Sequence, residues 1–219
     1  MMVLLCTGGI GSGKSFVVSI LQAMGCPAYD CDARAKALYD EDPALLQEVV
    51  ALTGREVLTP ERRLDRKALA ARLFVDPALR TQIEALVHPA VIRDFERWKA
   101  VLPTQTASVV GAAPISQTDA PNAQRESLAV LESAIMLEHP QYQPLYDKVL
   151  VVSAPEEVRI ARVMARDGAS REGVLQRMAS QWPEERRRAA ADYIIENDGE
   201  QPLLPQLTRI LSQLQYGKD

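Results

Sequence analysis

The chain has 219 residues, of which 47% are hydrophobic and 25% are charged, the balance of a folded protein with one sizeable core. The formal net charge of −4 argues against a nucleic-acid-binding protein, which normally carries a clear basic excess. No apolar run is long enough to span a membrane, and the first one ends in glycines without the basic flank of a signal peptide. We therefore expect a soluble protein that binds neither nucleic acid nor membrane and needs no obligate protein partner.

Three cysteines, Cys6, Cys26 and Cys31, lie near apolar stretches. Their odd number and their spacing do not fit a disulfide framework, so we predict reduced thiols and a cytoplasmic location. A metal site at Cys26 and Cys31 is the weaker interpretation, because no third or fourth ligand lies nearby in the sequence.

Residues 3–7 form a short apolar run without alternation, as expected of a strand that is buried on both faces. After a glycine-rich stretch, residues 14–24 repeat apolar positions at helical spacing, and Gly25 marks the end of that helix. Residues 27–30 are predicted to form a second strand, which ends at the sequence Asp30-Cys31-Asp32.

The next part of the chain is predicted to be entirely helical, with helices at 33–39, 43–52, 66–74, 77–86 and 89–101. From 103 to 124 the helical signal disappears in a stretch that is rich in Thr, Ser, Ala, Pro and Gln. We predict a long loop or a partly disordered segment there, with a brief strand at Val109-Val110.

Strands and helices alternate again after this segment. Strands are predicted at 128–131, 149–152 and 193–195, a basic helical stretch at 156–188 and a closing helix at 202–214. Five short buried strands separated by helices indicate an α/β fold with a doubly wound parallel sheet. We divide the chain into an α/β core (1–32 and 125–219, with a lid at about 156–188), a helical lobe (33–102) and an insertion (103–124).

The stretch GGIGSGKS, residues 8–15, fits the pattern G-x-x-x-x-G-K-[ST] without a mismatch. Glycines let successive amides surround a phosphate, and the positive end of the following helix points at the same anion. The lysine would neutralise the outer phosphates, and the Ser15 hydroxyl would be positioned for Mg²⁺. The nucleotide-binding residues predicted here are Gly9, Gly11, Ser12, Gly13, Lys14, Ser15 and the flanking Phe16.

Two other interpretations of this loop are weaker. A plain turn between a strand and a helix matches the pattern by chance in roughly one chain in a hundred of this length. A dinucleotide fingerprint needs G-x-G-x-x-G, whereas the glycines here run Gly9-x-Gly11-x-Gly13 and are followed by Lys14-Ser15. The phosphate loop of a P-loop NTPase is therefore favoured.

The rest of the sequence favours a small-molecule kinase over other P-loop proteins. The N-K-x-D and D-x-x-G sequences of a GTPase do not occur in the chain, and motors and transporters are usually larger. A kinase needs a substrate lobe, a carboxylate that orients the acceptor hydroxyl, and a mobile basic lid. Each of these three parts has a candidate in the sequence.

Asp30 and Asp32 are the candidate carboxylates, because they follow the second strand, whose carboxyl end faces the binding crevice of a doubly wound sheet. Both could instead serve as the cap of the next helix. The candidate lid carries Arg159, Arg162 and Arg166 at three- and four-residue spacing, so that one helix face presents several guanidinium groups to a phosphoryl group. The alternative is an ordinary solvated helix face.

The chain resembles the dephospho-coenzyme A kinase family in an ordered set of short motifs. The phosphate-loop motif TGGIGSGKS (7–15) is followed by DCDARA (30–35), LDRKAL (64–69), LFVDP (73–77) and LVHPAV (86–91). The lid and the last strand contribute RDG (166–168), RMASQ (177–181) and ADYIIENDG (191–199). The resemblance spans nearly the whole chain and is far more specific than the phosphate loop alone.

The resemblance implies that ATP, with Mg²⁺, phosphorylates the 3′-hydroxyl of the ribose of dephospho-coenzyme A. Asp32 would orient or deprotonate the acceptor, while Lys14, Arg162 and Arg166 would stabilise the phosphoryl group in transfer. The helical lobe would bind the substrate. The further contacts expected are Asp30, His88 and Arg93 to the substrate and Asn197 to the nucleotide base.

Three of these residues also have a structural interpretation: His88 as a helix-junction histidine, Arg93 as an exposed cation and Asn197 as a turn former.

The sequence also departs from the family at three places. Phe16 follows Ser15 where Thr is usual, the D-x-P-L-L-x-E segment appears at 132–138 without its proline, and the 103–124 stretch looks longer than the family needs. The missing proline weakens any role for Glu132 or Glu138. Another small-molecule kinase and a non-catalytic nucleotide-binding protein remain the alternative functions.

Overall fold

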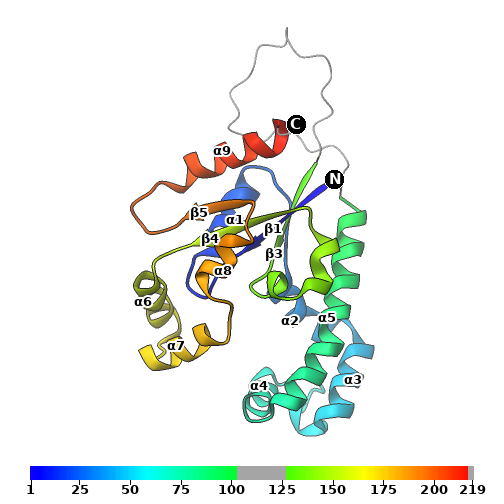
Figure 1. Ribbon diagram of the computed structural model, residues 1–219. Helices are drawn as coiled ribbons and strands as arrows, with labels where there is room; N and C mark the ends of the chain where they lie inside the picture. The colour runs from blue at the N-terminus through cyan, green and yellow to red at the C-terminus, as the bar shows by residue number, and fades with distance from the viewer. Residues whose placement is uncertain (103–126, 217–219) are drawn as a thin grey trace. The chain divides into compact units, whose positions relative to one another are not determined.

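The computed structural model describes residues 1–102 and 127–216, apart from the side chains of residues 215 and 216. Within these residues, five parallel strands form one sheet in the order β2-β3-β1-β4-β5 (Figure 1). The strands are β1 (Met2–Thr7), β2 (Ala28–Asp30), β3 (Leu128–Glu132), β4 (Lys148–Ser153) and β5 (Tyr193–Glu196). All five predicted strands are therefore confirmed, with ends that differ by at most one residue.

The central strand β1 explains why its sequence is an unbroken apolar run. It pairs with β3 on one side and β4 on the other, so that Leu5 faces Leu131 in one neighbour and Val149 in the other. Residues 3–6 of β1 are at most 3% exposed. A strand that is covered on both faces has no position for a polar side chain.

The described residues also form a series of α-helices. They are α1 (Lys14–Ala23), α2 (Cys31–Glu41), α3 (Pro43–Thr53), α4 (Arg66–Val75), α5 (Pro77–Ala100), α6 (Glu156–Asp167), α7 (Arg171–Ala179), α8 (Glu184–Ala189) and α9 (Leu203–Tyr216). Short 3₁₀ turns are η1 (Arg55–Val57), η2 (Met136–Glu138) and η3 (Pro140–Leu145). No described helix is both long enough and apolar enough to cross a bilayer.

The chain divides into two compact units. Unit 1 consists of Met1–Tyr29 and Pro103–Asp219, and unit 2 is Asp30–Leu102. In unit 1, α1 and α9 contact each other and contribute Val17, Leu21 and Leu207, all fully buried, to the core around the sheet. Burying each such side chain is worth about 1.5–3 kcal/mol. Cys6, Cys26 and Cys31 are all buried, and none of them forms a disulfide with a described residue.

Unit 2 is a group of helices whose starts are fixed by aspartate. Each of α2, α3, α4 and α5 has an aspartate N-cap whose side chain accepts a hydrogen bond from a backbone N–H in the first turn; these are Asp30, Asp42, Asp65 and Asp76. Such a cap contributes about 1 kcal/mol. Pro43 and Pro77 then occupy the first helical position, where a proline costs no hydrogen bond.

One helix prediction was wrong. The stretch 77–101 was expected to hold two helices that break before Pro89, but α5 runs through it as one helix. Pro89 is exposed, and the buried face Ile83, Val87, Val91 and Phe95 continues past it at four-residue spacing. Packing of this face outweighs the one backbone hydrogen bond that a proline removes.

The basic stretch 156–188, which was predicted to be helical, contains three helices, α6, α7 and α8. Gly168, with φ 64°, ends α6 in the left-handed region. Ser170 then caps α7, and Pro183 precedes α8. The predicted insertion at 103–124, with its brief strand, lies outside the described residues, and the assignment of unit 2 as a substrate lobe stays a prediction.

Candidate active site

The phosphate loop joins the end of β1 to the start of α1 in unit 1. Gly11 (φ 81°) and Gly13 (φ 88°) both adopt the left-handed conformation, and Gly13 is the N-cap of α1. The amides of Gly11, Gly13, Lys14 and Ser15 donate to no residue that the structure describes. Unpaired N–H groups at the positive end of a helix form a binding site for an anion such as phosphate.

Three side chains from distant parts of unit 1 hold the loop in this shape. Asn197 Nδ2 donates to Ser12 O at 2.7 Å, and Arg162 Nη1 lies 3.5 Å from the same oxygen. On the other side of the loop, Ile10 N donates to Gln181 Oε1 at 2.9 Å. The loop is therefore held in a fixed arrangement before any ligand binds, which lowers the cost of binding one.

Asn197, predicted to contact the nucleotide base, is buried at the end of β5. Its own N–H donates to Ser153 O at 2.7 Å, so the residue connects β4, β5 and the phosphate loop. Its bond to Ser12 is a loop-supporting role that sequence reasoning missed. Contact with a base stays a prediction.

The predicted cations differ in what they already bind. The side-chain amine of Lys14 forms no hydrogen bond or ion pair with any described residue. Arg162 reaches Ser12 and, at 3.4 Å, Asn197 Oδ1. Arg166 is instead exposed and paired with Asp167 at 2.7 Å, and Asp167 also binds Arg177. The structure thus brings Arg162 to the phosphate loop and leaves Arg166 in a surface cluster.

Ser15 contacts a carboxylate that sequence reasoning did not assign. Its hydroxyl donates to Glu132 Oε1 at 2.7 Å, and Glu132 is 6% exposed at the end of β3. Burial and the nearby Glu132 raise the pKa of the Cys6 thiol to about 12, with Lys14 acting in the opposite direction. The signal that could have found Glu132 is its position as the last residue of the strand beside β1.

This pair of oxygen ligands fits Mg²⁺. A hydroxyl and a buried carboxylate next to a phosphate site are hard oxygen donors of the kind that Mg²⁺ takes together with substrate phosphates. Phe16, the next residue, is 62% exposed, and its backbone N–H donates to Gly13 O at 3.1 Å. Its side chain therefore plays no part in the packing of unit 1.

The two candidate carboxylates in unit 2 differ in whether they already accept a hydrogen bond. Asp30 caps α2, with Oδ1 accepting from Ala33 N at 2.9 Å. Asp32, in the first turn of α2, is exposed, and its carboxylate forms no hydrogen bond or ion pair with any described residue. Of the two, only Asp32 has both carboxylate oxygens available for an acceptor hydroxyl.

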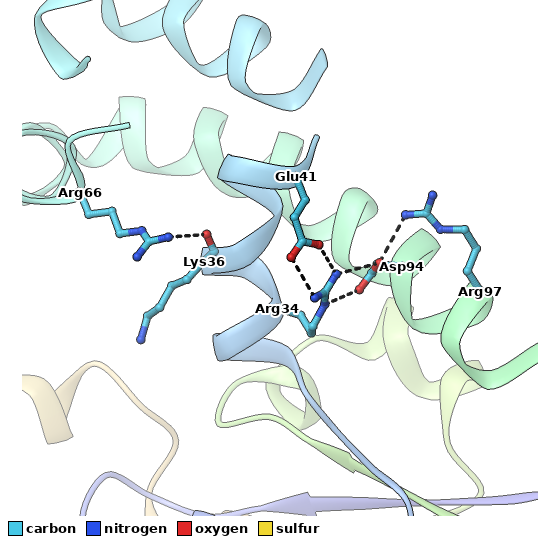
Figure 2. A network of polar contacts seen from close by, with 6 residues as sticks. All are labelled: Arg34, Lys36, Glu41, Arg66, Asp94 and Arg97. Carbon is cyan, nitrogen blue, oxygen red and sulfur yellow. Dashed lines mark hydrogen bonds and ion pairs between the residues drawn. The ribbon is translucent and has the colours of Figure 1, made fainter. Parts of the chain in front are cut away.

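The helix that carries Asp32 is held within unit 2 by an ion-pair network (Figure 2). Arg34 Nε lies 2.8 Å from Asp94 Oδ2 on α5, and its Nη2 lies 2.7 Å from Glu41 Oε2 at the other end of α2. Hydrogen bonds to these two carboxylates raise the pKa of Arg34, so its guanidinium stays charged. This network fixes α2 on α5 and thereby limits the movement of the first turn of α2.

The other predicted substrate contacts lie on α5. His88 is half-buried and interacts with another residue. It lies within the helix rather than at a junction. Arg93 is exposed and forms no hydrogen bond or ion pair with the residues described. Arg93 is therefore the one of this pair that keeps a free charge for an anionic ligand.

Comparison with known proteins gives a consistent result over nearly the whole chain. Residues 2–202 match the model of the family described as dephospho-CoA kinase. The dephospho-CoA kinase of Anaeromyxobacter dehalogenans is 36% identical over 213 residues, covering 97% of this chain and 92% of its own. That of Porphyromonas gingivalis is 37% identical over 206 residues, covering 94% and 90%.

Solved structures agree on the fold. A crystal structure of a Thermus thermophilus protein is 34% identical, with a TM-score of 0.75 and 97% of both chains covered. A dephospho-CoA kinase from Campylobacter jejuni is 22% identical, with a TM-score of 0.64 and 98% of both chains covered. At that identity the second comparison speaks for the fold alone.

Proposed function

This chain belongs to the dephospho-CoA kinase family and has dephospho-CoA kinase activity, and we propose the following roles for its residues in that reaction. The loop at 8–15 binds the β- and γ-phosphates of ATP. The unpaired amides of Gly11, Gly13, Lys14 and Ser15 support this assignment most directly. They are fixed by Asn197 and Gln181 from outside the loop, so the site is organised before ATP arrives.

The chain's own cations stabilise the phosphoryl group as it moves to the acceptor. Lys14, which has no carboxylate partner among the described residues, neutralises the outer phosphates. Arg162 adds a guanidinium beside Ser12. A positioned cation that meets charge developing in the transition state contributes more to the rate than one that is already paired with a carboxylate.

Asp32 orients the 3′-hydroxyl of the ribose of dephospho-CoA and accepts its proton. Its free carboxylate in the first turn of α2 supports this role, whereas the carboxylate of Asp30 caps the helix. Unit 2 binds the body of the substrate, with Arg93 and His88 as contacts. The products are coenzyme A and ADP. The three buried cysteines, which form no disulfide with a described residue, support a location in the cytoplasm.

Ser15 and Glu132, which are joined by a hydrogen bond, would hold Mg²⁺ when the nucleotide is bound. The ion would supply positive charge to the phosphates. We expect Glu132→Gln to raise the Mg²⁺ concentration for half-maximal activity by about 10–100-fold. The reason is that the glutamine amide has no negative charge with which to fix the Ser15 hydroxyl. The measurement is a Mg²⁺ titration of the initial rate at saturating ATP. Glu185→Gln, an exposed carboxylate on α8, is the control. An unchanged titration would remove Glu132 from the metal site.

A panel of acceptors with radiolabelled ATP tests the substrate assignment. We expect transfer to dephospho-CoA and none to nucleoside monophosphates or shikimate-like alcohols. Transfer to a nucleoside monophosphate alone would show that this is a different small-molecule kinase. ADP binding without transfer to any acceptor would support the non-catalytic alternative.

A further inference from the structure

Arg159 on α6 is a buried cation without a counter-ion. The residue is 6% exposed, and its Nε is buried and has no hydrogen-bond partner. Its guanidinium forms no hydrogen bond or ion pair with any residue that the structure describes. A buried charge is costly to a folded protein unless it is paired, so its presence calls for an explanation.

The neighbouring arginines show that pairing is available in this part of unit 1. Arg187, which is 2% exposed, binds Glu138 at 3.1 Å and lies 3.7 Å from Glu184. Arg171 binds Glu157 at 2.6 Å on the surface. Both carboxylates lie within ion-pair distance of Arg187, although the buried oxygens of Glu184 accept no hydrogen bond, and neither carboxylate is within ion-pair distance of Arg159.

The unpaired guanidinium lies against the phosphate loop. A Cβ built on Gly9 would be 2.5 Å from Arg159 Nη1 and 3.1 Å from Arg187 Nη1. A Cβ on Gly11 would collide with the backbone of Arg159 itself. The absence of side chains at these two glycines therefore lets Arg159 approach the loop backbone closely, next to amides that have no partner.

We infer that Arg159 is a phosphate-binding residue, and that its missing counter-ion is the polyphosphate end of the bound nucleotide. This inference rests on the proposed function of the loop. A guanidinium binds phosphate oxygens through two parallel N–H groups, and Arg159 adds such a group to the cradle formed by the loop amides. It takes the place beside the loop that residue spacing alone gave equally to Arg166.

The inference predicts that removing the charge has opposite effects with and without ligand. Without nucleotide, Arg159→Met should unfold at a higher temperature than the wild type, because an unpaired buried charge is replaced by an apolar side chain of similar length. With ADP or inorganic pyrophosphate, the order should reverse. The dissociation constant for ADP should rise by about tenfold or more, since a charge-assisted contact is lost.

Thermal unfolding with an ADP titration, followed by calorimetric binding of ADP and pyrophosphate, tests this on the full chain. Arg171→Met, which removes an exposed and paired arginine of α7, should leave the ADP shift unchanged. Gly9→Ala keeps the charge of Arg159 but displaces Nη1, so it should weaken ADP binding as well. Arg159→Lys should recover part of the affinity, and it replaces Arg159→Met if that variant does not fold.

The outcomes separate the two proposals. If ADP does not stabilise the wild type, the nucleotide role of the loop fails, and the inference about Arg159 fails with it. If ADP stabilises the wild type and Arg159→Met equally, only the inference is overturned. A lower unfolding temperature of Arg159→Met without ligand, together with wild-type ADP affinity, would show that Arg159 merely supports the packing of α6.

Discussion

Replacing Asp32 by asparagine should lower the turnover of dephospho-CoA at least about a hundredfold while ATP still binds. Asparagine keeps the size of the side chain but cannot take a proton from the acceptor hydroxyl. The free carboxylate of Asp32 in the first turn of α2 makes this the expected site of loss. Steady-state rates at saturating ATP and dephospho-CoA measure the change, and calorimetry with ADP measures nucleotide binding.

The neighbouring aspartate provides the matched control. Asp30→Asn also removes one negative charge, but asparagine is as good an N-cap as aspartate, so α2 should keep its stability. We expect the turnover of Asp30→Asn to fall much less than that of Asp32→Asn. Near-normal turnover of Asp32→Asn would remove Asp32 from the base role, and equal losses in the two variants would point to a shared effect of charge rather than to proton transfer.

The elements that could be predicted from sequence are those whose signal is local. The run around Leu4 and Leu5 is apolar because β1 is covered on both faces, and this requirement leaves a pattern in consecutive residues. The phosphate loop is also contiguous, so its amide arrangement follows from glycine positions and the start of α1. For the same reason Asp30 and Asp32 were found together, although only the structure separates the helix cap from the free carboxylate.

The features that escaped prediction depend on contacts between distant residues. The sequence predicts two helices on either side of residues 87–88, but the buried face of α5 outweighs the backbone hydrogen bond that Pro89 removes. The spacing of Arg159 and Arg166 puts them on one side of a helix, but it does not say which of them packs on another element. Glu132 reaches Ser15 from the neighbouring strand, 117 residues away in the chain. No short pattern records such a contact.

Gly13→Ala should reduce nucleotide affinity at least about a hundredfold and lower the unfolding temperature. Two costs combine at this position. A left-handed φ of 88° costs an alanine roughly 1–2 kcal/mol. The new Cβ would also collide with Asn197 Nδ2, whose displacement breaks the bond to Ser12 O and leaves buried polar groups unpaired, at a cost of about 1–3 kcal/mol. Calorimetric titration with ADP and thermal unfolding measure the two effects.

Gly25→Ala separates these two costs, because Gly25 has a similar φ of 94° and a Cβ there would meet nothing within 4 Å. This control should lose stability from the backbone term alone and should bind ADP like the wild type. If Gly13→Ala binds ADP no worse than Gly25→Ala, then the contact with Asn197 does not hold the loop amides in place. The loop would in that case owe its shape to its own glycines, and the brace from the end of β5 would have no part in binding the phosphates.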